Sequence, residues 1–319
     1  MVSDNYLDAP QLPPAIFLMG PTAAGKTDLA VELVQRCACE IISVDSALIY
    51  KDMNIGSAKP DAQTLALAPH HLINIRDPLE AYSAACFRAD ALELMAQITA
   101  RGKVPLLVGG TMMYYKALME GLAPLPASEP TLREQLEQEI QDHGLLAMHH
   151  RLCEIDPVAG ARINQADPQR ITRAMEVFLL SGETLTSHWA RQKQQQLPYQ
   201  ITSIGVWPED RAVLHKRIEQ RFKSMLAQGF EQEVLSLMAR KDLHLDLPSM
   251  RCVGYRQMWQ HLSGDYDYAT MQHKGIVATR QLAKRQLTWL RSWPQLHTFD
   301  SLDAKLTFNV LQLFDRIER

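Results

Sequence analysis

The sequence predicts an α/β fold, in which an open parallel β-sheet is flanked by helices and carries a mostly helical insertion domain. In roughly the first third of the chain, short apolar runs alternate with segments whose apolar residues recur at helical spacing. The string GPTAAGKT, at 20–27, lies between one such run and one such helix. From 127 to 197 the pattern is mostly helical. Strands that alternate with helices pair in parallel and place helices on both faces of the sheet.

The first part of the chain contains four predicted strands and two predicted helices. The strands are expected at 15–19, 41–44, 72–75 and 104–108. The helices are expected at 27–37 and 87–100, where apolar residues repeat every three or four positions. With the GPTAAGKT loop after the first strand, this order predicts a P-loop NTPase-like sheet.

The insertion is predicted from its helix start and stop signals. Thr131 and Glu134 form a capping box that opens a helix running toward Gly144. Asp167 followed by Pro168 indicates a second helix start, and Gly182 ends that helix. The polar run 192–196 is typical of a surface connection.

After the insertion the α/β pattern resumes. A strand is expected at 201–206, followed by a long helix that passes through Arg217 and Arg221 and ends at Gly229. A further helical region covers 268–291, and 296–299 is expected to be the last strand. The predicted domains are therefore a core made of 14–126 and 198–319, whose C-terminal part is helical, and the helical insertion 127–197.

Composition and cysteine usage limit the protein class. The net charge of -3 does not indicate a nucleic-acid binder, so such a role would require local basic patches. Five cysteines without a C-x-x-C pair predict reduced thiols and no zinc site. There is no signal-peptide core near the N-terminus and no apolar stretch of about 20 residues. We expect a cytoplasmic protein without membrane contact.

The GPTAAGKT loop is built to bind phosphate. Its glycines let consecutive backbone N–H groups turn inward, Lys26 adds a positive charge, and the Thr27 hydroxyl can ligate Mg²⁺. The helix that follows directs the positive end of its dipole to the same place. The predicted phosphate-binding residues are Gly20, Pro21, Thr22, Ala23, Ala24, Gly25, Lys26 and Thr27. The motif leaves an ATPase, a small-molecule kinase and a diphosphate-using transferase open.

Two further loops are expected to share this cleft, because adjacent parallel strands deliver their C-terminal ends to one edge of the sheet. Asp45 follows the strand at 41–44 and has three possible roles. It can hold Mg²⁺, cap a helix beginning near Ala47, or act as a general base. Gly109 and Gly110 follow the strand at 104–108 and allow close backbone approach, and Thr111 adds a hydroxyl.

Several blocks of this sequence together resemble the bacterial tRNA dimethylallyltransferases, in the same order and from about residue 14 to 295. They are GPTAAGKT at 20–27, DSALIY at 45–50, IGSAKP at 55–60, VGGTMMYYKAL at 108–118, DPQRITRAMEVF at 167–178, RCVGYRQMW at 251–259 and TRQLAKRQLTWLR at 279–291. The resemblance implies transfer of the dimethylallyl group from dimethylallyl diphosphate to N6 of adenosine-37, in tRNAs that read codons beginning with U. The loop would then bind the diphosphate of an isoprenoid donor.

The resemblance also implies roles for individual residues. Lys26, Mg²⁺ near Thr27 and Arg221 would stabilise the charge that develops on the leaving diphosphate. Asp45 would take the proton of the adenine amine, and Thr22 would lie near the diphosphate. The implied catalytic residues are therefore Asp45, Thr22 and Arg221.

The implied partner is the anticodon stem-loop of tRNA, whose adenosine must be flipped out of its stack. Residues 251–291 contain seven arginines and lysines against two aspartates, so this part of the chain is locally basic. Thr111 is expected to position the donor or the nucleotide, and Arg133, near the start of the insertion, is a further expected contact. The implied tRNA-binding residues are Asp45, Ser46, Ala47, Leu48, Thr111, Arg133, Gln169, Arg170, Ile171, Thr172, Arg173, Arg251, Cys252, Val253, Gly254, Tyr255, Arg256, Lys284, Arg285, Gln286, Leu287, Thr288, Trp289, Leu290 and Arg291.

Two alternative enzymes share the phosphate loop. A small-molecule kinase would explain the loop and Asp45 but not the basic C-terminal third. An adenylate isopentenyltransferase would prenylate a free adenine nucleotide and would need neither the helical insertion nor the two C-terminal blocks. A non-enzymatic RNA-binding protein would not need the phosphate loop. The family further implies a monomer.

Overall fold

The structure, a computed structural model, describes residues 12–191 and 197–317. The connection predicted at 192–196 lies outside the described residues. By its internal contacts the chain divides into two compact units, Met119–Gln196 and the combination of Met1–Leu118 with Leu197–Arg319. The first of these overlaps the predicted insertion, 127–197. Within the described residues, no helix is both long enough and apolar enough to cross a membrane.

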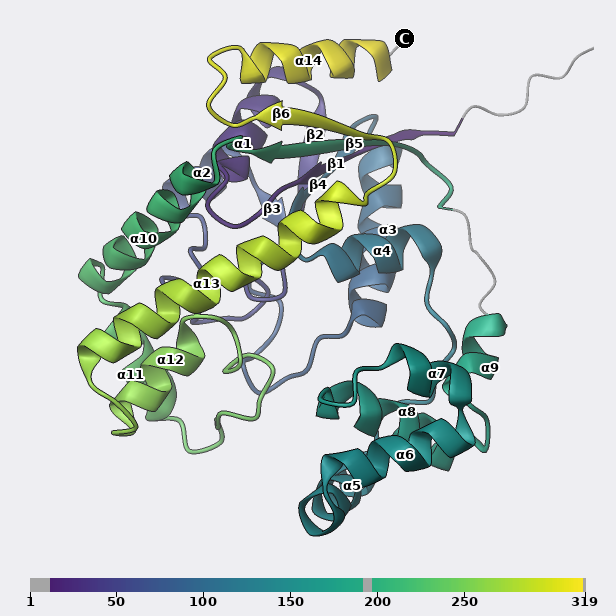
Figure 1. Ribbon diagram of the computed structural model, residues 1–319. Helices are drawn as coiled ribbons and strands as arrows, with labels where there is room; N and C mark the ends of the chain where they lie inside the picture. The colour runs from purple at the N-terminus through teal and green to yellow at the C-terminus, as the bar shows by residue number, and fades with distance from the viewer. Residues whose placement is uncertain (1–11, 192–196, 318–319) are drawn as a thin grey trace, which may run out of the picture. The chain divides into compact units, whose positions relative to one another are not determined.

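The larger unit contains a sheet flanked by helices (Figure 1). Its strands are β1 (Pro14–Met19), β2 (Cys39–Val44), β3 (His70–His71), β4 (Val104–Gly109), β5 (Gln200–Trp207) and β6 (Leu296–Asp300). Its helices are α1 (Lys26–Arg36), α2 (Ala62–Leu67), α3 (Ala84–Ala100), α4 (Met112–Glu120, which runs into the other unit), α10 (Arg211–Ala227), α11 (Phe230–Met238), α12 (Tyr255–Leu262), α13 (Tyr268–Arg291) and α14 (Leu306–Ile317).

The sheet order among the described residues is β3-β2-β4-β1-β5-β6, and neighbouring strands pair in parallel throughout it. The predicted α/β parallel sheet is therefore confirmed. Because β2, β4 and β1 are neighbours, the loops after Val44, Gly109 and Met19 all leave the same edge of the sheet. This edge carries the three loops that the sequence singled out.

The two faces of β1 pack against different helices. Ile16 and Leu18 face a cluster that includes Leu33 of α1 and Phe314 of α14. Phe17 points the other way, and its ring centroid lies 5.0 Å from that of Tyr115 on α4. Side chains alternate between the faces of a strand, so a strand covered by helices on both faces is apolar throughout. Each fully buried large side chain contributes roughly 1.5–3 kcal/mol.

Two local predictions are wrong. The third strand is not at 72–75 but at His70–His71, because Leu72 and Asn74 adopt left-handed backbone conformations (φ 62° and 57°) that end the pairing. The first insertion helix does not start with a capping box at Thr131. Glu129 caps it instead, and its carboxylate accepts the N–H groups of Thr131 and Leu132. Pro130 fixes the first helical position, so the cap must precede it.

The smaller unit is helical and has its own core. Its complete helices are α5 (Pro130–His143), α6 (Leu145–Ile155), α7 (Pro157–Arg162), α8 (Pro168–Ser181) and α9 (Leu185–Ala190). Asp167 caps α8 through the N–H of Arg170, and Gly182 ends it in the left-handed conformation, as predicted. Leu136, Leu152 and Met175 belong to one buried cluster. Packing of the apolar faces of these helices stabilises the unit.

The long helix α13 packs beside α10 in the larger unit (Figure 1). Gly275 lies against the Phe222 ring, where an added Cβ would come within 2.2 Å of the ring. This close approach brings α13 against Phe222 of α10. Further along α13, the side chain of Gln286 contacts the loop that follows β1.

Candidate active site

The loop between β1 and α1 has the backbone geometry expected of a phosphate cradle. Gly25 has a φ of 94°, which favours glycine, and Ala23 also lies in the left-handed region at 63°. A Cβ on Gly20 would come within 2.3 Å of the Val206 carbonyl oxygen on β5. Turned backbone of this kind gathers N–H groups into an anion-binding concavity. The loop can therefore receive a diphosphate at the N-terminus of α1.

Lys26 is held inside this loop. Its ammonium donates to the carbonyl oxygens of Gly20, at 2.9 Å, and Pro21, at 2.7 Å. Burial and the nearby Arg221 guanidinium lower the pKa of Lys26 to about 8, and the Asp45 carboxylate partly opposes this shift. A phosphate oxygen beside the ammonium would favour the charged form.

Arg221 reaches the same place from α10. Burial lowers the pKa of Arg221, and the carboxylates of Asp45 and Asp28 oppose that effect. The three residues Lys26, Arg221 and Asp45 thus act on one another electrostatically although α10 is far from the loop in sequence. Two cations and one carboxylate thus lie within electrostatic range of one another.

Asp45 organises the turn after β2. Its Oδ1 atom accepts the N–H groups of Ala47, at 2.8 Å, and Leu48, at 3.3 Å. No helix starts at Ala47 in this segment, so the helix-cap hypothesis for Asp45 is wrong and a turn takes its place. Both bonds end on Oδ1, so neither occupies Oδ2.

The loop after β4 joins this turn. The Thr111 hydroxyl accepts the N–H of Ser46 at 3.2 Å, and its own N–H donates to the Val44 carbonyl oxygen at 3.2 Å. Gly109 lies so close to β2 that an added Cβ would come within 2.1 Å of the Val44 carbonyl oxygen. The loops after β2 and β4, which were predicted to share a cleft, are therefore joined by hydrogen bonds.

Tyr114 and Tyr115, to which sequence reasoning gave no role, and Cys252, an implied tRNA-binding residue, also lie within electrostatic range of Asp45. Its charge contributes to raising the pKa values of Tyr114, Tyr115 and Cys252, although burial is the larger cause for each. Burial raises the pKa of Cys252 to about 12, so its thiol is neutral. Tyr115 donates to the carbonyl oxygens of Leu18 and Leu107, which fixes α4 against the sheet. The adjacent tyrosines after VGGTMM were the available signal.

The segment 251–256 divides into buried and exposed residues. Tyr255 is 1% exposed, and its hydroxyl donates to Glu233 at 2.6 Å. The same carboxylate accepts backbone N–H groups of the 54–56 turn at 2.7–3.0 Å. Arg251 and Arg256 are exposed, Gly254 is buried, and Cys252 and Val253 are intermediate. Glu233 therefore ties this segment to the IGSAKP block, a link that no sequence signal indicated.

The C-terminal part of α13 also has two sides. Lys284, Arg285, Thr288 and Arg291 are exposed, whereas Gln286 and Leu290 are buried. Leu287 and Trp289 are intermediate, and the Lys116 ammonium lies 5.6 Å from the Trp289 ring centroid. The basic side chains predicted to bind RNA are thus accessible on one helix.

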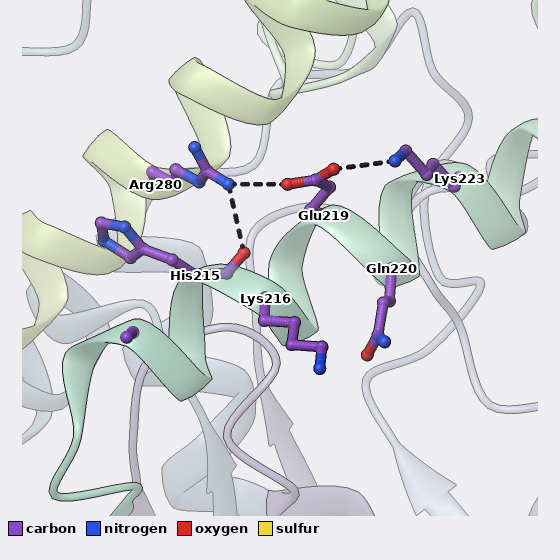
Figure 2. Close-up of a pocket in the computed structure, with 7 residues that line it drawn as sticks. His215, Lys216, Glu219, Gln220, Lys223 and Arg280 are labelled. Atoms are coloured by element: carbon purple, nitrogen blue, oxygen red, sulfur yellow. Dashed lines mark hydrogen bonds and ion pairs between the residues drawn. The ribbon is translucent and has the colours of Figure 1, made fainter.

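A hollow of about 480 Å³ lies between α10 and α13. Figure 2 shows the Arg280 guanidinium between the Glu219 carboxylate, at 3.0 Å, and the His215 carbonyl oxygen, at 3.5 Å. Lys223 donates to the same carboxylate at 2.7 Å, and Lys216 also lines the hollow (Figure 2). Arg280 therefore connects the two helices, unlike the exposed Lys284.

In the smaller unit, the predicted RNA-binding residues divide in the same way. Gln169 and Arg170 are exposed at the start of α8, but Ile171 is 0% exposed and packs in the core beside the buried Thr172. For these two residues the structure gives a packing role in place of a surface contact. Arg133 and Arg173 both donate to the Glu176 carboxylate.

Glu176 is 0% exposed. It accepts from Arg133 at 3.1 Å, Arg173 at 2.6 Å, the Ser128 hydroxyl and the Glu129 N–H. Burial alone would raise the pKa of Glu176, but these hydrogen bonds outweigh it and lower the pKa to about 2. A buried charge that is paired and fully hydrogen-bonded is stable. Arg133 and Arg173 consequently have a structural role, whatever else they contact.

A magnesium site fits the residues at the loop. Among residues 12–191 and 197–317 there is no group of three or more histidine, cysteine or carboxylate side chains that could hold a metal by itself. Mg²⁺ at phosphate sites needs only one or two protein oxygens, because phosphate oxygens and waters complete its octahedron. The exposed Thr27 hydroxyl at the start of α1 suits this mode of binding.

These features define a class of protein. A phosphate loop, two cations and one carboxylate meet at the C-terminal edge of a parallel sheet, where ligands of open α/β folds bind. Cations in such a site can stabilise a phosphate-type leaving group, and a carboxylate beside them can accept a proton. The fold and site are those of a group-transferring P-loop enzyme.

Comparison with known proteins identifies the family. The model of the IPP transferase family matches residues 48–293, and that of isopentenyl transferases matches residues 14–76. The tRNA isopentenylpyrophosphate transferase of Bacillus halodurans is 34% identical, with a TM-score of 0.70 over 95% of this chain and 96% of that one. The tRNA delta(2)-isopentenylpyrophosphate transferase of Staphylococcus epidermidis is 30% identical, with a TM-score of 0.69 over 96% and 99%. The chain belongs to the IPP transferase family.

A eukaryotic dimethylallyltransferase acting on tRNA has the same fold. Its TM-score is 0.80 at 23% identity, over 95% of this chain and 77% of that one. At this identity the likeness supports the architecture only. It confirms that the parallel sheet and its helices form a known arrangement.

Proposed function

We propose that the chain transfers the dimethylallyl group of dimethylallyl diphosphate to N6 of adenosine-37, 3′ of the anticodon, in tRNAs that read codons beginning with U. The products are N6-(dimethylallyl)adenosine in tRNA and diphosphate. The observation that supports this most strongly is the electrostatic cluster of Asp45, Lys26 and Arg221 at the phosphate loop of an IPP transferase family member. Both bacterial structures above are named as tRNA isopentenylpyrophosphate transferases.

The donor half of the reaction uses the phosphate loop. When the allylic C1–O bond breaks, negative charge grows on the diphosphate, and preorganised cations stabilise it. The Lys26 ammonium and the Arg221 guanidinium supply this charge, and the loop 20–25 supplies backbone N–H groups. Mg²⁺ held at Thr27 would add a further charge at the phosphate oxygens. Thr22 lies in the same loop, where it can contact the diphosphate.

The acceptor half uses Asp45. The amine of adenine is a weak nucleophile because its lone pair is delocalised into the ring. As the N6–C1 bond forms and the C1–O bond breaks, the amine must lose a proton, and a positioned carboxylate can accept it. Oδ1 of Asp45 is bonded to the turn after β2, so Oδ2 is the oxygen that suits this role.

The adenosine reaches this site only if it leaves its stack, which costs a few kcal/mol. Phosphate contacts elsewhere on the protein can offset that cost. The exposed basic residues Lys284, Arg285 and Arg291 on α13, with Arg251 and Arg256, are suited to these contacts. Gln169 and Arg170 are exposed on the smaller unit and remain predicted contacts.

One experiment separates this function from its alternatives. Labelled dimethylallyl diphosphate is incubated with the protein and either unmodified tRNA or AMP, with Mg²⁺ present. Label on tRNA alone supports the proposal, and label on AMP indicates an adenylate isopentenyltransferase. Hydrolysis of ATP without transfer of label would indicate a nucleotide-hydrolysing enzyme and contradict the proposal.

The proposal includes the setting of the reaction. We place it in the cytoplasm, where tRNA is present, and expect one copy of the chain to act alone. Sedimentation of the protein with and without a tRNA anticodon stem-loop would measure this stoichiometry. A 2:1 complex of protein and RNA would overturn the monomer.

A further inference from the structure

We propose that Gln286 is a positioning residue for the transfer reaction: it clamps the diphosphate loop to the loop after β4 and does not itself bind tRNA. The proposal rests on the proposed function, because it concerns the loop that binds the donor. It also separates Gln286 from its neighbours on α13, which keep their predicted contacts with RNA.

Two hydrogen bonds carry the proposal. The Thr22 N–H donates to Oε1 of Gln286 at 2.9 Å, and Nε2 of Gln286 donates to the Gly110 carbonyl oxygen at 2.9 Å. Thr22 follows β1 and Gly110 follows β4, which are adjacent strands. One side chain therefore joins the two loops that flank the donor site.

The side chain is not available to RNA. Gln286 is 8% exposed, whereas Lys284 and Arg285 just before it are exposed. Its carbonyl and its amide group both already have partners within the protein. An RNA contact by Gln286 would have to break one of these bonds and leave a buried polar group unpaired, which is unfavourable.

The chemistry of the amide suits this position. Oε1 faces a backbone donor and Nε2 faces a backbone acceptor, so the residue needs one acceptor and one donor at the end of the same side chain. An ionised glutamate could accept from Thr22 but could not donate to Gly110. Asparagine is one methylene shorter and could not reach both loops from the same backbone position.

The surrounding backbone leaves room for this amide. A Cβ on Gly110 would come within 2.3 Å of Nε2 of Gln286 and within 3.1 Å of the Gly20 carbonyl oxygen. Glycine at 110 therefore allows Gln286 to approach between the two loops. The close approach of Gln286 therefore explains why the second residue of the VGGT glycine pair, Gly110, is a glycine. Phosphate binding alone does not require a glycine at this position.

The clamp fixes the Thr22 N–H relative to the rest of the diphosphate loop. An anion site is effective when its donors are preorganised, because no energy is then spent on ordering them during the reaction. Loss of the clamp should weaken donor binding and slow transfer. It should not weaken tRNA binding, since the exposed cations of α13 are unchanged.

The test compares Gln286→Leu with Gln281→Leu, a matched change at an exposed position of the same helix. We expect Gln286→Leu to raise KM for dimethylallyl diphosphate and lower kcat, each by about tenfold, because both hydrogen bonds of the side chain are lost and each is worth up to about a factor of ten. The Kd for tRNA should stay within twofold. Gln281→Leu should match the wild type. A tenfold weaker tRNA affinity with unchanged donor KM would overturn the proposal.

A second variant tests the donor and acceptor pattern itself. Burial raises the pKa of a glutamate, and a protonated carboxyl, like the amide, has one donor and one acceptor. In Gln286→Glu we therefore expect activity relative to the wild type to recover as the pH falls from about 8 to about 5.5, where protonation restores the missing donor. A pH-independent ratio would show that the donor pattern does not matter and would count against the clamp.

A third measurement tests the clamp without tRNA, so its result does not depend on the identity of the prenyl acceptor. Calorimetric binding of inorganic diphosphate with Mg²⁺ should weaken in Gln286→Leu even without tRNA. Suppose that the wild type binds diphosphate and the variant does not, but that the wild type transfers no label to tRNA. The clamp then stands, and the proposed acceptor is wrong. If the variant binds diphosphate as well as the wild type does, the clamp is wrong.

Discussion

The Lys26 ammonium donates to the Pro21 carbonyl oxygen at 2.7 Å, so the cation that is proposed to hold the diphosphate is bonded to the backbone of its own loop. Burial and the nearby Arg221 keep the pKa of Lys26 at about 8 rather than at 10.5. Its charge is therefore sensitive to pH within a range that can be measured.

We predict that binding of dimethylallyl diphosphate takes up a proton at alkaline pH. The anion favours the charged ammonium, so binding raises the pKa of Lys26 above about 8. Affinity should be constant below pH 8 and should fall by up to about tenfold per pH unit above it, with an uptake approaching about one proton per complex. Calorimetry in buffers of different ionisation enthalpy measures this uptake. Lys26→Arg should abolish it, because arginine stays charged.

Replacement of Asp45 should separate its two roles. Asp45→Asn keeps an Oδ1 acceptor for the N–H groups of Ala47 and Leu48 but removes the base. We expect kcat to fall by about 10²–10⁴-fold, the usual contribution of a positioned general base. The affinities for donor and tRNA should change little, since the proton moves only in the transition state. A loss of donor binding of the same size would assign Asp45 to the metal instead.

The ion-pair cluster of the smaller unit should control its stability. Glu176→Gln should destabilise this unit by on the order of 2–3 kcal/mol near neutral pH, because the native cluster lowers the pKa of Glu176 from 4.5 to about 2. For a carboxylate with a lowered pKa, this stability is present above about pH 4.5 and is lost as the pH falls toward about 2. Thermal unfolding from pH 2 to pH 7 measures it. A parallel pH dependence in the wild type and the variant would contradict the prediction.

Arg133→Ala tests the same cluster from the side of the cation. Arg133 donates to Glu176 at 3.1 Å, so its loss should lower the unfolding temperature and leave tRNA affinity nearly unchanged. Unaltered stability together with weaker tRNA binding would instead make Arg133 the RNA contact that the resemblance implies.

The exposed cations of α13 should carry RNA affinity without chemistry. Lys284→Ala combined with Arg285→Ala should weaken tRNA binding. The slope of the logarithm of the tRNA binding constant against the logarithm of the salt concentration should become shallower, by the amount expected for the loss of about one to two phosphate contacts. The rate of transfer at saturating tRNA should stay close to that of the wild type. The matched control is Arg36→Ala with Lys305→Ala, a pair of exposed cations on α1 and beside α14. An equal loss of affinity in the control would mean that only net charge matters.

The sequence alone determined the secondary structure wherever local forces decide it. Helix α13 has its predicted bounds, and Asp167 and Gly182 delimit α8 as predicted, because periodicity and caps act within a few residues. The P-loop geometry likewise follows from its own glycines. The prediction of a strand at 72–75 was wrong because an apolar run there forms a turn. The prediction of a capping box at Thr131 was wrong because Pro130 occupies the first helical position and Glu129 is the cap.

Only the tertiary structure decided which distant residues meet. Arg221 comes within electrostatic range of Asp45 because α10 packs against α13 and the phosphate loop, where Leu214 and Ile218 share a cluster with Ala23. Gln286 reaches Thr22 across 264 positions of sequence. In the sequence, Gln286 is one polar residue in a basic run. Its position in the helical pattern does not indicate that its amide is buried between two loops. Burial and backbone partners depend on how α13 packs against α10 and the two loops, and packing of this kind leaves no local pattern.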